Sequence, residues 1–435
     1  MCNWIVGSRD SLVRPPPESP SNMAVKDNYQ YSTPPLSSAG TDERRSNLPS
    51  WMASIMPSSV RSQKTAESVP RPYDKNQDYL TGVRGVLVPM SFLWMFMQTF
   101  LPAAVKGSLN TTGPGWQLAL RKSLSVLFWN DTLIYGSIIF LSARTICLPF
   151  LLEPTKTVLA SCVFRRGIRL WFPVAVALIV CYAAFTNGLG GNQYLYDFSA
   201  LTENVSMNAD MYILPNSLAN FNSIFEIFWV SNNFQTQAGN WAFPTQTLWV
   251  ITAVFQQSYT VFMTMVIIPY TRLRWRVMGA FVFIITAWWV YSWAWYSITG
   301  LLIADAVINM GLRPGGDGTS WSLGKIQIPV WAVGAVLMAG GFIMQFIWVA
   351  ARPDLMNSEL YYHTGLYSTG GINYGVDVST NQIRADCYLI IVGFFLILET
   401  SSVLQSILRS APFVFLGKRS FSKSSSHSHM QLAVV

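Results

Sequence analysis

The feature that most constrains the fold is the absence of charge over long apolar stretches. No charged residue occurs from Val86 to Val105, a run of 20 residues. A helix of that length is about 30 Å long, which matches the hydrocarbon core of a bilayer. Only 11% of the residues are charged, whereas soluble domains carry roughly 25%. The sequence therefore predicts an all-α, polytopic transmembrane helix bundle.

The apolar stretches divide the chain into about eight predicted spans. They lie at 79–105, 124–152, 168–186 and 245–269, as a tight pair within 277–311 that turns near Trp295, and at 329–351 and 386–408. Residues 1–75 are rich in Pro, Ser and Asn and are predicted to form a disordered leader, because such a composition cannot bury a core. Residues 422–435 form a polar tail.

The distribution of positive charge predicts the orientation. The net charge is +8, but the basic residues gather at the ends of spans, which is the positive-inside pattern and requires no nucleic-acid partner. The 58 residues at 187–244 contain no Lys or Arg and are predicted to lie in the lumen or outside, either as a glycosylated surface loop or as a lid over an acceptor site. Both termini are then cytosolic, in an endomembrane or the plasma membrane.

Several titratable residues interrupt the apolar segments. Asp131 and Arg144 are 13 positions apart, about 20 Å along a helix, so one of them lies within the membrane unless Arg144 extends to its edge. Asp305 and Glu399 are further acids in predicted spans. Each of these acids is either a functional residue or a partner in a buried ion pair. The five cysteines are scattered, which indicates reduced thiols and no metal site.

Four segments resemble, in the same order, the signatures of the acyltransferase-3 family, in a fungal style. The first is YLTGVRGVLV at 79–88, and the others are VFRRGIRLWFP at 163–173, FPTQTLWVITAVFQQSYTVF at 243–262 and SAPFVFLGKRSF at 410–421. The signature residues in them are Gly82, Gly85, Trp249, Gln256 and Tyr259. The resemblance covers 79–421 and implies an acyltransferase-3-like transmembrane domain.

The resemblance also implies a reaction. Members of the family move an acyl group from acyl-CoA to a hydroxyl of a small-molecule, sugar or lipid acceptor, with acyl-CoA as co-substrate and no bound cofactor. Four arginines stand where the CoA phosphates would bind: Arg84, Arg165, Arg166 and Arg169. From charge alone, the last three could equally anchor a span at the membrane surface.

Two titratable positions of the family are replaced. The family's histidine, eleven positions after the first arginine, is Met95 here, and its glutamate is Val254. A thioether cannot take a proton, so the catalytic residue is unassigned, with Asp131 and Asp305 as the remaining candidates. None of the three histidines, His363, His427 and His429, falls in a predicted span.

Two other function classes stay open. A catalytically inactive relative could act as a scaffold or regulator, and charged residues within spans are also typical of a solute transporter. The last signature runs into a polar tail that is too short to cross a membrane, which indicates a truncated product or an altered reading frame.

The predicted orientation can be tested at the sequon that begins with Asn204. Because 187–244 should lie in the lumen, Asn204 should carry a glycan in a eukaryotic host. Endoglycosidase should shift the wild-type band, and Asn204→Gln should lose that shift. Cleavage of this loop by protease added from the cytosolic side would contradict the orientation.

Overall fold

The computed structural model describes residues 77–108, 112–185, 213–230, 237–323, 326–356, 359 and 383–420, all within one compact unit, Pro49–Val435. Predictions about the leader 1–75, the tail 422–435, Asn204 and the three histidines fall outside these residues.

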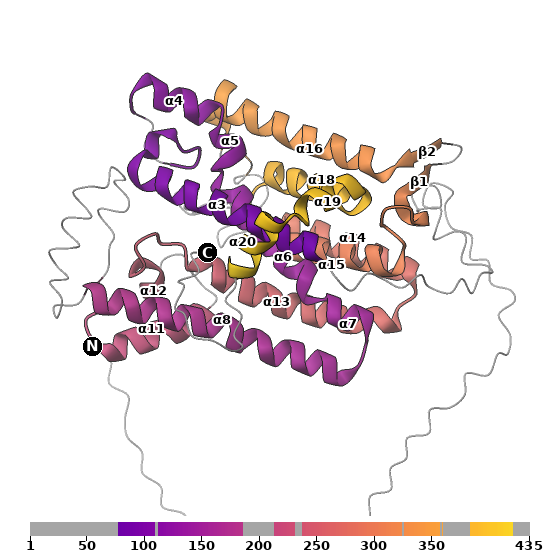
Figure 1. Ribbon diagram of the computed structural model, residues 1–435, viewed down its shortest axis with the longest axis horizontal. Helices are drawn as coiled ribbons and strands as arrows, with labels where there is room; N and C mark the ends of the chain where they lie inside the picture. Colours follow the sequence, from indigo (N-terminus) through magenta and orange to yellow (C-terminus); the bar gives the residue numbers. More distant parts are fainter. Residues whose placement is uncertain are drawn as a thin grey trace, which may run out of the picture. The chain divides into compact units, whose positions relative to one another are not determined.

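The described residues are almost entirely helical (Figure 1). Up to the middle of the chain the elements are α3 (Asp78–Phe100), η1 (Pro102–Ala104), α4 (Gly115–Lys122), α5 (Ser125–Phe128), α6 (Asp131–Ile146), α7 (Leu148–Leu152), α8 (Lys156–Phe185), α11 (Ser217–Trp229), α12 (Ala238–Trp241) and α13 (Trp249–Ile267). They continue with η3 (Ile268–Tyr270), α14 (Leu273–Trp289), α15 (Ala294–Asn309), η4 (Asp317–Thr319), β1 (Ser320–Leu323), β2 (Ile326–Pro329), α16 (Val330–Phe346), η5 (Ile347–Ala351), η6 (Pro353–Leu355), α18 (Ala385–Thr400), α19 (Ser402–Leu408) and α20 (Ala411–Ser420). Strands β1 and β2 form one antiparallel pair.

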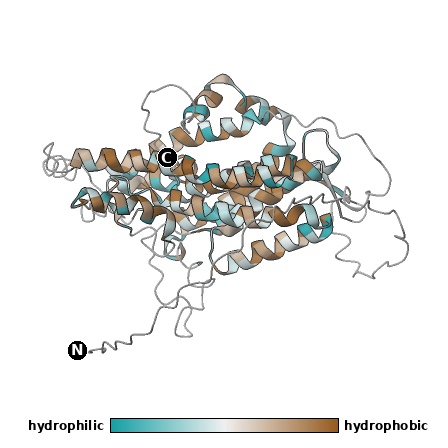
Figure 2. Cartoon of the chain, turned by 90° about the horizontal axis from the view of Figure 1, so that it is seen from below, coloured by the Kyte–Doolittle hydropathy of each residue, from teal (hydrophilic) through white to brown (hydrophobic). Residues whose placement is uncertain are grey.

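Five helical stretches are long and apolar enough to cross a membrane: Asp78–Phe100, Ser125–Leu152, Lys156–Phe185, Trp249–Tyr270 and Val330–Ala351. Large apolar side chains on them face outward, as Phe164, Met263 and Val336 do with more than 70% of their surface exposed. Figure 2 shows this hydrophobic colouring along the helices. The chain therefore has the build of a helical integral membrane protein.

The remaining predicted spans are shorter or bent. Helices α14 and α15 form the predicted pair, but they have 17 and 16 residues and turn at 290–293. Helices α18 and α19 meet at a bend of 100°, where Ser401 caps α19 by accepting from the N–H of Leu404. The structure thus supports five spans, or six if this bent pair is one span.

Two segments differ from their predicted form. The third span was predicted from 168, but α8 begins at Lys156, because Lys and Arg favour helix and extend it beyond the apolar core. Its arginines therefore lie on a helix rather than in a loop. Part of the predicted loop 187–244 is helix α11, which begins at the cap Asn216 and buries Ile224, Ile227 and Phe228 as one apolar stripe.

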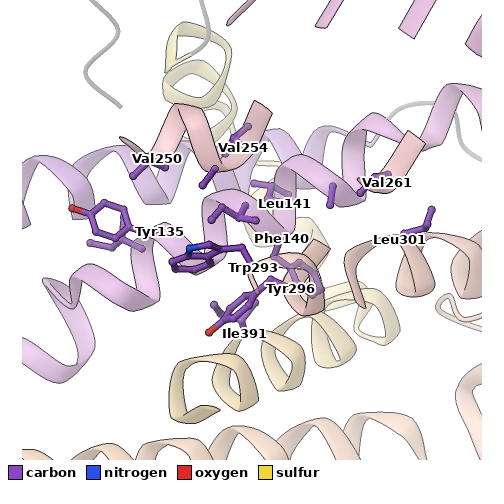
Figure 3. Packing of buried hydrophobic residues seen from close by; sticks show 14 of the residues in the cluster. Tyr135, Phe140, Leu141, Val250, Val254, Val261, Trp293, Tyr296, Leu301 and Ile391 are labelled. Carbon is purple, nitrogen blue, oxygen red and sulfur yellow. The ribbon is translucent and has the colours of Figure 1, made fainter. Parts of the chain in front are cut away.

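The core lies where α6, α13, α15 and α18 meet (Figure 3). Tyr296 is fully buried and donates to the carbonyl of Arg384 at 2.9 Å. Tyr135 packs edge-on against Trp94 and Trp249, with ring centroids 5.3 and 4.7 Å apart. Such contacts between aromatic rings fix the relative rotation of the helices that carry them.

Glycines bring α3 unusually close to α19 and α20. A Cβ added at Gly82 would lie 1.9 Å from the carbonyl oxygen of Leu408, and one at Gly85 would lie 1.9 Å from that of Phe413. Likewise, a Cβ added at Gly417 on α20 would lie 1.9 Å from the carbonyl oxygen of Thr81 on α3. The absence of a side chain at Gly82 and Gly85 therefore allows the backbones of these helices to approach closely.

Replacing Gly85 should separate these helices. We expect Gly85→Ala to lower the free energy of unfolding by about 1–3 kcal/mol, the usual cost of overpacking. Gly340 in α16 is a matched control, because a Cβ there would meet no atom within 4 Å. Thermal unfolding in detergent should show a lower midpoint for Gly85→Ala and an unchanged or higher one for Gly340→Ala. Equal midpoints would contradict the close approach.

Candidate functional site

A cluster of arginines forms at the junction of α3, α6, α8 and α13. Arg84 on α3 donates from Nη2 to Thr145 Oγ1 at 2.8 Å. Arg166 on α8 donates from Nε to Ser258 Oγ at 3.0 Å, and its Nη2 donates to Ser142 Oγ. We call Arg84, Arg166 and Arg169 the arginine cluster, because Arg84 and Arg169 are the charged neighbours that act electrostatically on Arg166.

The hydroxyls that receive these arginines are oriented by their own helices. Thr145 donates to the carbonyl of Leu141 at 2.8 Å, and Ser258 donates to that of Val254 at 2.6 Å. A hydroxyl that gives its proton to the backbone leaves its oxygen lone pairs for a guanidinium. Ser142 and Thr145 are three residues apart on α6, so they share one face of that helix.

The arginine cluster has few compensating negative charges. Among the residues that the structure describes, no carboxylate forms an ion pair with Arg166 or Arg169. Several cations held together by neutral hydroxyls favour an anion, and a guanidinium fits phosphate oxygens in a bidentate manner. The arrangement can therefore bind a phosphate.

The structure brings together three of the four predicted arginines. Arg165 is exposed and is not among the charged neighbours of Arg166. Arg169 is also exposed, but it lies one helical turn from Arg166 and acts on it electrostatically. Arg165 thus stands apart from the arginine cluster.

A buried ion pair lies beside the arginine cluster. Arg144 on α6 and Glu399 on α18 are 0% and 1% exposed, and Arg144 Nη2 lies 2.9 Å from Glu399 Oε1. The other carboxylate oxygen accepts from the hydroxyl of Tyr79 at 2.7 Å. Of the two alternatives for Arg144, the structure favours the one within the bundle, because its side chain is 0% exposed and its charge is neutralised by Glu399. The sequence offers three acids in apolar segments, Asp131, Asp305 and Glu399, and does not indicate which of them pairs with Arg144.

The two candidate catalytic acids have different surroundings. Asp305 is buried and accepts from Arg276 Nη1 at 2.7 Å and from Asn309 Nδ2 at 2.5 Å, so it serves as a structural ion pair. Asp131 starts α6 and is 8% exposed, with a contact from the hydroxyl of Thr132 at 3.2 Å. Among the described residues, Asp131 therefore has fewer hydrogen-bond partners than Asp305 and no ion pair.

The two positions at which the resemblance implies a histidine and a glutamate carry buried apolar side chains. Met95 and Val254 are 8% and 6% exposed, and both belong to the apolar core. The three histidines of the chain all fall outside the described residues, so no imidazole lies in the part that the structure describes.

The predicted signature residues on α13 do not converge. Trp249 is buried, and its backbone N–H is held by Asn240 Oδ1 at 3.0 Å. Gln256 approaches only the carbonyl of Val230, at 3.5 Å, and Tyr259 is 39% exposed on the helix surface. Within the described residues no group of three or more His, Cys, Asp or Glu side chains could hold a metal ion.

Comparisons of the chain with models of protein families, with curated proteins and with solved structures find no match.

Removing one partner of the ion pair between Arg144 and Glu399 should lower the stability of the protein. Arg144→Met leaves the Glu399 carboxyl buried without its cation, and we expect a loss of roughly 3–5 kcal/mol of stability. The double variant Arg144→Met/Glu399→Met should recover most of that loss in thermal unfolding. The exposed pair Arg352–Asp354, about 60% exposed on each side, is the control, and Arg352→Met should cost less than about 1 kcal/mol. A double variant no more stable than the single one would contradict this role.

Proposed function

We propose that this chain is a membrane acyltransferase-like protein that binds the phosphates of acyl-CoA at the arginine cluster. The observation that carries the proposal is the convergence of cations from α3 and α8 on hydroxyls of α6 and α13. Three of these helices, α3, α8 and α13, carry segments whose sequences resemble the acyltransferase-3 signatures. The acyl group would pass to a hydroxyl of a small-molecule, sugar or lipid acceptor.

Helix α6 supplies a direction for the bound donor. Ser142, at the arginine cluster, and Asp131, at the start of the helix, are 11 residues apart, about 16 Å along the axis. A donor whose phosphates are held near Ser142 would extend its thioester along the helix toward Asp131. Asp131 is therefore the described acid best placed to take a proton from an acceptor hydroxyl, whereas Asp305 is occupied by Arg276.

A second candidate is a catalytically inactive member that binds acyl-CoA as a scaffold or regulator. The observation that favours it is the burial of Met95 among apolar side chains, at the position where the resemblance implies a histidine. This candidate predicts acyl-CoA binding without turnover. The active enzyme predicts both.

The proposal includes an orientation. CoA is a cytosolic metabolite, so the arginine cluster would face the cytosol, together with the N-terminus, in an endomembrane or the plasma membrane. The eight-span count would then require α14, α15 and the bent pair of α18 and α19 to cross the bilayer together with the five longer helices. The positive-inside rule agrees with this placement of the arginines.

Labelled acyl-CoA binding to the purified protein tests the proposal. Arg166→Gln should weaken binding by roughly 1–3 kcal/mol, the range for hydrogen bonds to a charged group. Arg165→Gln is the matched control, because it removes the adjacent arginine of the same helix without touching the cluster. Arg166→Lys keeps the charge, so it separates loss of charge from loss of the bidentate geometry.

Thermal unfolding of each variant must accompany these measurements, since Arg166 also links α8 to α6 and α13. Equal acyl-CoA affinity in Arg166→Gln and Arg165→Gln, with both variants stably folded, would overturn the proposed phosphate site.

A further inference from the structure

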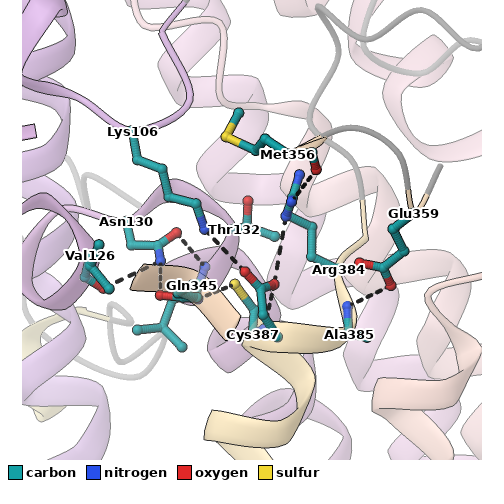
Figure 4. Close-up of polar contacts among 12 residues, drawn as sticks. Lys106, Val126, Asn130, Thr132, Gln345, Met356, Glu359, Arg384, Ala385 and Cys387 are labelled. Atoms are coloured by element: carbon teal, nitrogen blue, oxygen red, sulfur yellow. Dashed lines mark hydrogen bonds and ion pairs between the residues drawn. The ribbon is translucent and has the colours of Figure 1, made fainter. Parts of the chain in front are cut away.

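A second polar cluster lies at the start of α18, away from the arginine cluster (Figure 4). We call Lys106, Glu359, Arg384 and Asp386 the α18 cluster. Lys106 Nζ lies 3.3 Å from Asp386 Oδ2, and the two side chains are 2% and 0% exposed. Two charges this deeply buried must be compensated locally.

Both cations of the α18 cluster are already engaged by other groups. Lys106 pairs with Asp386, and Arg384 Nε lies 3.6 Å from the second oxygen of the same carboxylate. Arg384 also lies over the ring of Trp348, 5.1 Å from its centroid, and donates from Nη2 to the carbonyl of Met356. Neither cation therefore forms an ion pair with Glu359 in the described part of the chain.

Among the described residues, only one of the two carboxylate oxygens of Glu359 has a hydrogen-bond partner. Its Oε1 accepts from the backbone N–H of Ala385 at 3.0 Å. Its Oε2 is buried and has no hydrogen-bond partner among the described residues. A buried carboxyl group with one oxygen unpartnered and no ion pair is most stable as the neutral acid.

The electrostatic surroundings of Glu359 agree with this. The titratable groups that face it are Arg384 and Asp386 at the start of α18, Lys106 after η1, Tyr291 in the turn before α15, and Tyr296 on α15. Burial is the largest influence and raises the pKa of the Glu359 carboxyl to about 7, against the opposing effect of Arg384.

We propose that Glu359 is a proton-binding site whose protonation strengthens the contacts of Met356 and Glu359 with the start of α18. There are two such contacts: Arg384 donates to the carbonyl of Met356, and the N–H of Ala385 donates to Glu359. We call Glu359 docked when it makes its contact with Ala385 and detached when it does not. The neutral acid can stay docked at low cost. The carboxylate has to be hydrated, so it favours the detached state.

The direction of the pH dependence follows from linkage. The docked pKa of about 7 lies above the ordinary 4.5, so the docked state binds more protons than the detached state between these two values. Docking is therefore strongest below about pH 4.5 and weakens as the pH rises to about 7. The equilibrium should shift by up to about 100-fold over this range if the detached carboxyl titrates normally.

Hydrogen–deuterium exchange of the purified full chain tests the site. After correction for the intrinsic exchange rate, peptides covering 383–390 should lose protection as the pH rises from acid to neutral. Glu359→Gln is a neutral isostere of the protonated acid, so its protection should stay high and independent of pH. Asp354→Asn is the control, because Asp354 is an exposed acid on the same segment, paired with Arg352. It should retain the wild-type pH dependence.

A second measurement covers the case in which Glu359→Gln folds poorly. The infrared C=O band of a protonated carboxyl should disappear from the wild type across the same pH range. The band of Asp354→Asn should disappear over the same pH range as that of the wild type. Loss of protection with the same pH dependence in Glu359→Gln and the wild type, or a wild type with no such band, would overturn the proposal.

Discussion

The structure depends on the neutralisation of charge inside an apolar bundle. Arg144 is completely enclosed, and its ion pair with Glu399, which is itself held by Tyr79, joins α6, α18 and α3. Away from water, a charge without its partner costs far more than the pair gains, so these three helices can assemble only in a register that brings the groups together. The aromatic contacts of Tyr135 then join α6 to α3 and to α13 further along its length.

Helix α6 contacts two of the polar regions described above, one near each of its ends. Ser142 and Thr145 receive the arginine cluster near its last turn. At its start, the cap Asn130 donates to Gln345 at 3.0 Å, and Gln345 in turn lies 2.9 Å from the sulfur of Cys387, beside the α18 cluster. Between these ends most of the helix is buried, and Ser137 and Ile138 are half-buried.

The sequence predicts the helices well because the information that forms them is local. The lengths of apolar runs and the glycines beside Arg84 can each be recognised from neighbouring residues, whereas helix α11, which Asn216 caps, was not predicted. Contacts between residues that are distant in sequence are harder to predict. The spacing of the basic residues on α8 places Arg169 one turn from both Arg165 and Arg166, so only the packing against α6 and α13 decides that Arg166 points inward. Glu359 lies in a predicted loop, and nothing in the sequence indicates that it meets the N–H of Ala385.

The close approach of α3 to α19 and α20 also bears on how the chain is made. Gly82 and Gly85 meet Leu408 and Phe413, more than 300 positions later in the chain. The first apolar helix to leave the ribosome therefore enters the bilayer long before its neighbours exist. Until then its glycine face can be covered only by lipid or by an insertion factor. The packing of α20 against α3 therefore forms late, and the intervening helices must leave a place beside α3 vacant for it.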